Sequence, residues 1–260
     1  MRGVHCGPRL LYAPVMANDN DIMRLAVLID GDNTSHRIAD GLFEELARIG
    51  EASVRRIYGD FSNNHLKSWA DILSRHAIIA QQQFAYTTGK NSSDIALVID
   101  AMDLLHTGRF DGFCLVSSDS DFTRLAARIR EQGLYVYGVG EQKTPESLRQ
   151  ACHRFIYAEN LLPEAPAADR EPEKTGNALQ PPSAAAPLIR KAIAQMDDED
   201  GWVDLGGLGQ RLATLAPDFD PRTYGYAKLS ELVKHAGAFD VERMEGRGLR
   251  IRQKVAGRKN

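Results

Sequence analysis

Two uninterrupted apolar runs, each followed by aspartate, constrain the fold of this chain more than any other feature. Residues 25–29 lead directly into Asp30, and residues 112–116 lead through two serines into Asp119 and Asp121. An apolar run without polar alternation predicts a strand buried on both faces, as in parallel sheets that are covered by helices. Ligands of such sheets bind outside the carboxyl ends of the strands. We therefore expect these aspartates to line a crevice.

The chain up to about residue 160 alternates between short apolar runs and helical patterns. Apolar side chains recur with helical spacing at Leu42 and Leu46, and Ser35 or Asn33 is placed to cap that helix. Further strands are expected at residues 54–58, 77–80, 134–139 and 155–157, with helices near residues 38–49, 69–73, 95–105, 125–129 and 147–149. This alternation predicts an α/β fold with a mostly parallel sheet and helices on both faces.

A third acidic position, Asp94, follows the polar stretch 87–93 and opens a helical pattern. In a doubly wound sheet, the ends of the first and central strands become neighbours where the strand order reverses. Four carboxylates meeting there, with Asn33 as a neutral oxygen donor, suit Mg²⁺ or Mn²⁺. No histidine or cysteine accompanies them, which argues against zinc. The four carboxylates are those of Asp30, Asp94, Asp119 and Asp121.

Simpler interpretations of the same residues stand beside this one. Ser120 or Asp121 can cap the helix that follows, which accounts for one residue of the acidic pair but not for both. Ser117 and Ser118 either donate to a phosphate or close the turn. Lys90 either contacts a phosphate or is a solvated loop lysine.

Three short segments resemble the signatures of the NYN domain, of the LabA-like group of PIN-like nucleases. They are LIDGDN at residues 28–33, KNSSD at 90–94 and SSDSDF at 117–122, and the resemblance covers residues 24–160. It implies a Rossmann-like fold and Mg²⁺-dependent ribonuclease chemistry. It also implies that Asp30, Asp94, Asp119 and Asp121 are the catalytic metal ligands, supported by Asn33. The role of Asp32 is left open: it either faces away from the site or acts through water.

The composition changes at residue 163. Proline, alanine and charged residues without apolar periodicity predict a flexible linker over residues 163–186. Three apolar helical stripes follow, and residues 239–242 and 249–252 alternate as a hairpin. Three small helices and a hairpin indicate a winged-helix-like second domain over residues 187–254, after a first domain over residues 23–162.

Residues 219–232 closely resemble the core signature of OST-HTH/LOTUS domains. That family implies RNA binding and, in some members, a protein partner. Basic side chains can follow phosphates and tyrosines can stack on bases, although an ordinary charged surface explains the same residues. The expected RNA contacts are Arg222, Tyr224, Lys228, Arg247 and Arg250, with Lys90 in the first domain.

Bulk properties limit the remaining choices. The formal net charge of -3 provides no global positive field for nucleic acid, so any binding of RNA must use local patches. The three cysteines form no CxxC pair, and we expect a reducing cytoplasm. No apolar run is long enough to span a membrane. Residues 1–22 are expected to be a disordered leader, with Met1, Met16 or Met23 as the start, and residues 255–260 a basic tail. A homodimer is an open expectation.

Two other functions compete with the ribonuclease hypothesis. The segment DGDNT at residues 30–34 also fits the loop of haloacid-dehalogenase-like phosphatases, in which Asp30 would be the nucleophile. These enzymes need a lysine at a strand end, and the sequence offers none in a clear position. The other hypothesis is an RNA-binding adaptor that retains the metal-ligand positions but cleaves no RNA.

Overall fold

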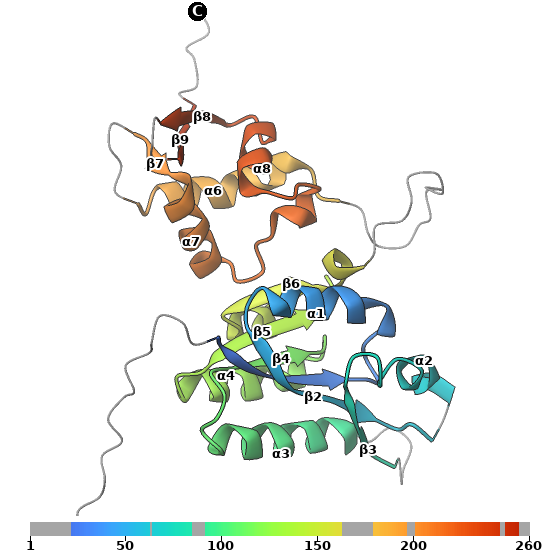
Figure 1. The fold of residues 1–260 in the computed structure, drawn as a ribbon. Helices are drawn as coiled ribbons and strands as arrows, with labels where there is room; N and C mark the ends of the chain where they lie inside the picture. The colour runs from blue at the N-terminus through green and yellow to red at the C-terminus, as the bar shows by residue number, and fades with distance from the viewer. Residues whose placement is uncertain are drawn as a thin grey trace, which may run out of the picture.

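The first domain is built on one parallel sheet, seen in the computed structural model of residues 22–62, 64–84, 92–162, 179–196, 201–244 and 248–254 (Figure 1). The six strands are ordered β3-β2-β1-β4-β5-β6. They span Arg24–Asp30 (β1), Glu51–Gly59 (β2), Ile79–Gln82 (β3), Gly112–Val116 (β4), Tyr135–Gly140 (β5) and Arg154–Tyr157 (β6). All neighbouring strands pair in parallel, so the order reverses between β1 and β4. The expected α/β class is confirmed.

Side chains of β1 alternate between two apolar layers. Ala26 and Leu28 belong to one core cluster, while Leu25, Val27 and Ile29 belong to the other, and all five are fully buried. Helices α3 (Ser92–His106), α4 (Thr123–Glu131) and α5 (Glu146–Ala151) supply the first layer. Helices α1 (Ala39–Ala47) and α2 (Lys67–Ala70) supply the second. Burial on both faces explains why the strands lack polar alternation.

Local details depart from the expected boundaries at two places. Helix α2 is a single turn, although the apolar pattern extended to residue 73. Strand β3 begins at Ile79 because Ala77 adopts a left-handed backbone, with φ 51°, that cannot continue a strand. Short 3-10 turns, η1 (His36–Ile38), η2 (Asn64–Leu66), η3 (Ser120–Phe122) and η4 (Ala158–Leu161), complete the domain.

The second domain has its own small core. Its elements are η5 (Pro182–Ala185), α6 (Ala186–Ile193), β7 (Val203–Asp204), α7 (Leu205–Leu215), η6 (Pro221–Tyr224), α8 (Leu229–His235), β8 (Phe239–Met244) and β9 (Gly248–Gln253). The expected hairpin β8–β9 is present, and β7 adds a third strand that the sequence pattern did not indicate. Residues 182–186, expected to be linker, instead form η5 and the first residue of α6.

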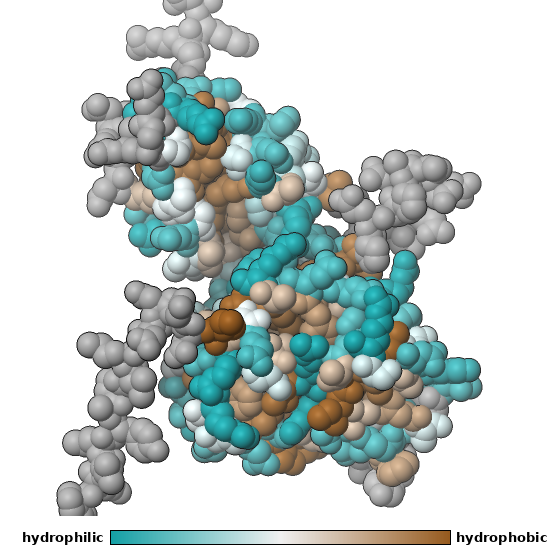
Figure 2. Space-filling view, viewed as in Figure 1, coloured by the Kyte–Doolittle hydropathy of each residue, from teal (hydrophilic) through white to brown (hydrophobic). Residues whose placement is uncertain are grey.

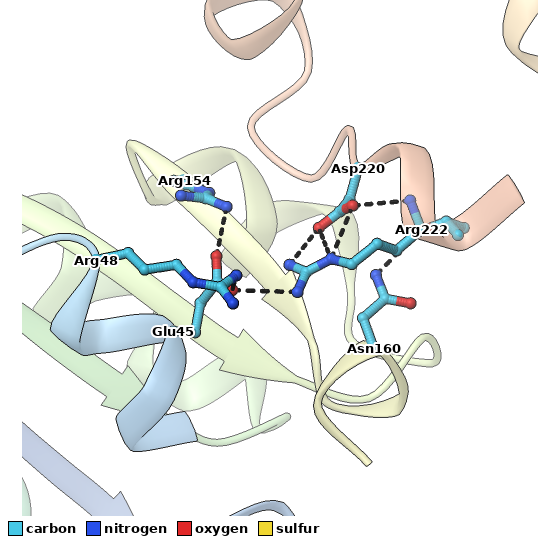
Figure 3. Close-up of polar contacts among 7 residues, drawn as sticks. Glu45, Arg48, Arg154, Asn160, Asp220 and Arg222 are labelled. Carbon is cyan, nitrogen blue, oxygen red and sulfur yellow. Dashed lines mark hydrogen bonds and ion pairs between the residues drawn. The ribbon is translucent and has the colours of Figure 1, made fainter. Parts of the chain in front are cut away.

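The two domains meet through polar contacts, and hydrophilic residues lie along this junction in Figure 2. Glu45 on α1 is almost fully buried and accepts hydrogen bonds from Arg154 of β6 (2.8 Å), Arg48 (3.2 Å) and Arg222 of the second domain (3.1 Å), as Figure 3 shows. Arg222 is also held by Asp220 of its own domain.

A second set of contacts anchors the segment around Asp218 to strand β6. The carboxylate of Asp218 accepts hydrogen bonds from Arg149 and from the Tyr157 hydroxyl, the latter at 2.6 Å. The backbone N–H of Phe155 donates to the carbonyl of Pro217 at 2.7 Å. The free edge of β6 therefore binds the second domain directly, which also protects that edge from other pairing.

Candidate active site

The ends of β1 and β4 lie side by side at the point where the strand order reverses. Ile29 pairs with Val116, so Asp30 and Ser117 follow at the same edge of the sheet. Asp30 is 1% exposed, and its Oδ2 accepts hydrogen bonds from Ser117 Oγ (2.7 Å) and Asn33 Nδ2 (3.0 Å). Its Oδ1 accepts a longer bond from the Asn33 backbone N–H at 3.3 Å.

The environment of Asp30 opposes its ionisation. Burial raises the pKa of Asp30 above 3.8, and the nearby Asp32 carboxylate raises it further, while the hydrogen bonds from Ser117 and Asn33 lower it. Asn33 and Ser117 therefore orient this carboxylate and stabilise its charged form. Both residues were predicted as supporting residues.

The loop after β4 positions Asp119 through its own backbone. The Ser117 hydroxyl accepts a hydrogen bond from the Asp119 N–H at 3.0 Å, and Asp119 Oδ1 accepts one from the Asp121 N–H at 2.9 Å. Asp119 is thus the N-cap of η3. The simpler interpretation named Ser120 or Asp121 as the cap, and the structure assigns that role to Asp119 instead. The Ser118 hydroxyl accepts from the Glu141 N–H at 2.8 Å and ties this loop to the end of β5.

Asp94 brings the separate acidic segments into one electrostatic cluster. It lies in the first turn of α3, as the sequence indicated. Burial raises the pKa of Asp94 from 3.8 to about 6, and the charges of Asp30, Asp119, Asp32 and Asp121 add to that increase. Hydrogen bonds from Ser117 to Asp30 and from Ser93 to Asp32 join the three sequence segments, and the like charges of their carboxylates repel at neutral pH. Lys90, from the same signature, lies outside the described residues.

Asp32 faces this cluster, which the sequence left open. Its Oδ2 accepts a hydrogen bond from Ser93 Oγ at 3.0 Å, and its charge raises the pKa of both Asp30 and Asp94. β1 ends at Asp30 and Gly31 begins a bend, so the direction of the Asp32 side chain is set by this bend and not by the strand. There is no room for a side chain at Gly31, because an added Cβ would lie 2.9 Å from Ile57 Cγ1 and 3.0 Å from the Tyr58 carbonyl oxygen.

The donor set fits a hard divalent cation in its chemistry. The cluster offers carboxylate oxygens, with the Asn33 amide beside them, and oxygen is the ligand that Mg²⁺ and Mn²⁺ prefer. Among the described residues, no three histidine, cysteine or acidic side chains are arranged to close around one ion. Mg²⁺ usually retains several waters and needs only one or two direct carboxylates, so an ion bound here would take its remaining ligands from water.

The predicted RNA contacts of the second domain have different surroundings. Arg222 is engaged by Glu45 and Asp220 at the domain junction, and the Tyr224 ring packs 6.0 Å from that of Phe219. Arg250 forms an ion pair with Glu242 at 2.7 Å and lies over the Trp202 ring. Lys228 is exposed to solvent. Arg247 lies outside the described residues.

A Rossmann-type sheet with acidic side chains converging at its switch point, joined to a small winged-helix-like domain, defines the structural class of this two-domain protein. The comparisons agree with this class. The family model of the NYN domain matches residues 24–162, and the chain belongs to this family. The model of the OST-HTH/LOTUS domain matches residues 180–251. Both resemblances noted in the sequence are thereby confirmed, in the expected order.

Solved structures and curated proteins add little beyond these matches. A protein of unknown function from Vibrio parahaemolyticus is 18% identical, with a TM-score of 0.46, over 54% of this chain and 96% of its own. An uncharacterized protein from Nitrosomonas europaea is 34% identical, with a TM-score of 0.27, over 38% of this chain and 92% of its own. No curated protein matches. Within the described residues, no helix is long and apolar enough to cross a membrane.

The phosphatase alternative gains no support from this geometry. A nucleophilic Asp30 would have to reach a phosphate, but its carboxylate is 1% exposed and accepts three hydrogen bonds from neighbouring residues. The NYN match likewise favours a nuclease over a phosphatase.

Proposed function

We propose that this protein is a Mg²⁺- or Mn²⁺-dependent ribonuclease that hydrolyses phosphodiester bonds and holds its RNA partly through the second domain. The observation that carries the proposal is the convergence of Asp30, Asp94 and Asp119 from three distant segments. Their mutual repulsion, which helps to raise the pKa of Asp94 to about 6, is the electrostatic condition that a divalent cation relieves.

Each carboxylate has a distinct supporting group. Asp30 is fixed by Ser117 and Asn33, and Asp119 is fixed by the N-cap bond at its Oδ1, while its Oδ2 accepts no hydrogen bond from the described residues. Asp94 retains a proton up to about pH 6, so it changes charge close to neutral pH. Asp121 and Asp32 complete the negative field. A divalent cation bound directly by one or two of the carboxylates of Asp30, Asp94 and Asp119, with water as its other ligands, would polarise the scissile phosphate and make an attacking water more acidic.

The OST-HTH/LOTUS match supports RNA as the substrate class. Lys228 remains exposed for phosphate contact, whereas Arg222 and Arg250 already neutralise carboxylates of this chain. We propose that Lys228 contributes the electrostatic part of RNA binding, together with Lys90 and Arg247, which lie outside the described residues. A cytoplasmic location is part of this proposal.

The proposal is tested with a matched pair of variants on helix α3. Asp94→Asn removes a charge from the cluster, while Asp103→Asn makes the same change nine positions later, half a turn out of phase with Asp94, at an exposed residue. Purified full-length proteins are incubated with structured and single-stranded RNA pools, with and without Mn²⁺. We expect Asp94→Asn and Asp119→Ala to lose at least about 100-fold in cleavage rate, and Asp103→Asn to match the wild type.

Two results would contradict the proposal. Cleavage that persists in Asp119→Ala would come from a contaminant or another site. RNA binding that survives chelator, with no cleavage of any RNA by the wild type, would favour the adaptor hypothesis.

A further inference from the structure

A cavity of about 190 Å³ lies beside the carboxylate cluster, on the α1 side of the sheet. Three strand ends line it through Val116 of β4, Val139 of β5 and Ala158, which directly follows β6. The loop after β1 forms one wall, from Asn33 to Ile38. Drug-sized ligands occupy pockets of about 300–1,000 Å³, so this cavity is sized for a single planar ring system rather than a whole nucleotide.

The cavity is continuous with the candidate active site. Asn33 lines the cavity and donates to Asp30 through its side-chain nitrogen at 3.0 Å. Ser118 also lines it and directly precedes Asp119. A chain whose phosphate lies at the carboxylates therefore has room to place an adjoining group here.

Most of the lining surface is apolar, and Glu141 and Glu159 add carboxylate acceptors to it. Glu159 Oε1 accepts a hydrogen bond from the Gln142 N–H at 2.9 Å. Its Oε2 is buried and has no hydrogen-bond partner among the described residues, which carries a free-energy cost. A carboxylate can only accept, so Oε2 requires an N–H or O–H donor. Glu159 lines the cavity, and the terminal torsion of glutamate is soft, so rotation of the carboxylate is the movement that would present Oε2 to a donor bound there.

A positive side chain stands at the rim. Arg37 is exposed and lines the cavity, and its guanidinium has no hydrogen bond or ion pair within the part of the chain that the structure describes. An arginine so placed suits a phosphate of the same strand, because phosphate contacts position nucleic acid without reading its sequence.

We propose that this cavity, which we call the Glu159 pocket, binds one unstacked base of the RNA next to the cleaved phosphate, with guanine preferred. Guanine presents two neighbouring N–H donors on one edge, which match a carboxylate, whereas the other RNA bases present fewer. Single-stranded RNA is read in this manner, by a flipped base against an apolar surface with hydrogen bonds to its edge. The inference rests on the proposed ribonuclease function for the identity of the strand.

The test compares Glu159→Gln and Ala158→Leu with the control Glu146→Gln, an identical change at an exposed residue of α5 outside the cavity. A randomised single-stranded RNA library is cleaved with Mn²⁺ and the new ends are sequenced. We expect the wild type and Glu146→Gln to favour guanine beside the cut, and Glu159→Gln to lose about tenfold of that preference. Ala158→Leu fills the cavity and should weaken selection of every base.

A second measurement separates this inference from the ribonuclease proposal. Binding of guanosine and uridine monophosphates to the full-length proteins is measured by calorimetry in chelator, and thermal unfolding confirms that each variant is folded. Stronger guanosine monophosphate binding by the wild type than by Glu159→Gln supports the pocket even if no RNA is cleaved, in which case the ribonuclease proposal alone fails. Equal binding by the wild type, Glu159→Gln and Ala158→Leu overturns the pocket whatever the cleavage results.

Discussion

Replacing Glu45 with glutamine should weaken the docking of the second domain. Its carboxylate is 6% exposed and forms ion pairs with Arg154, Arg222 and Arg48. Removing one partner of a fully buried ion pair costs about 3–5 kcal/mol. The cost here is smaller, because the Arg154 and Arg48 side chains are 44% and 70% exposed and can hydrate. The Arg222 side chain is 29% exposed, and it retains its ion pair with Asp220 when Glu45 is changed. We therefore expect Glu45→Gln to lower the free energy of unfolding of the docked second domain by about 2 kcal/mol.

The coupling that crosses the domain junction can be isolated by a double-mutant cycle of Glu45→Gln with Arg222→Gln. We expect a coupling energy of about 1 kcal/mol. The matched control is the exposed pair Arg128 and Glu131 on α4, with side chains 49% and 64% exposed, which should couple by only about 0.3–0.5 kcal/mol.

The chain contains two tryptophans, and each domain holds one, so each domain can be observed separately. Trp69→Phe leaves Trp202 as the reporter of the second domain, and Trp202→Phe leaves Trp69 as the reporter of the first. Urea unfolding followed by fluorescence in these backgrounds should show the second domain unfolding at lower urea when Glu45 is changed. A Glu45–Arg222 coupling no larger than that of Arg128–Glu131 would refute the reasoning.

Two further predictions concern the candidate active site. Gly31→Ala places a Cβ 2.9 Å from Ile57 Cγ1, so we expect a destabilisation of about 1–3 kcal/mol in urea unfolding, together with weaker Mn²⁺ binding; a variant as stable as the wild type would show that the bend relaxes freely. The pH dependence follows from the pKa of Asp94, which burial and its neighbouring carboxylates raise to about 6. The folded protein holds this proton up to about pH 6 and the unfolded chain releases it near its ordinary value of 3.8, so without metal this group's contribution to stability is lost as pH rises between these values. Asp94→Asn should flatten that part of the stability profile, and Mn²⁺ binding by the wild type should weaken below about pH 6; an unchanged profile in Asp94→Asn would contradict the assigned cause.

Much of the first domain followed from local pattern. Strand β1 was evident because burial on both faces demands an unbroken apolar run, and Asp94 was correctly placed in a first helical turn. Asp32 was left open because its direction depends on the bend that follows β1, and the strand pattern ends at Asp30. Strand β7 was missed because a two-residue strand carries no periodicity of its own and exists only by pairing with β9. The metal-ligand roles stay predictions.

The sequence by itself determined where most strands and helices of the first domain form and which carboxylates follow the strand ends, because these depend on neighbours a few residues apart. Only the tertiary structure decided the use of Arg222, which the sequence presented as an RNA contact and which instead pairs with Glu45, 177 residues away. The Glu159 pocket is likewise assembled from the ends of separate strands. Such contacts depend on the packing of distant segments, and no local pattern encodes which of them will meet.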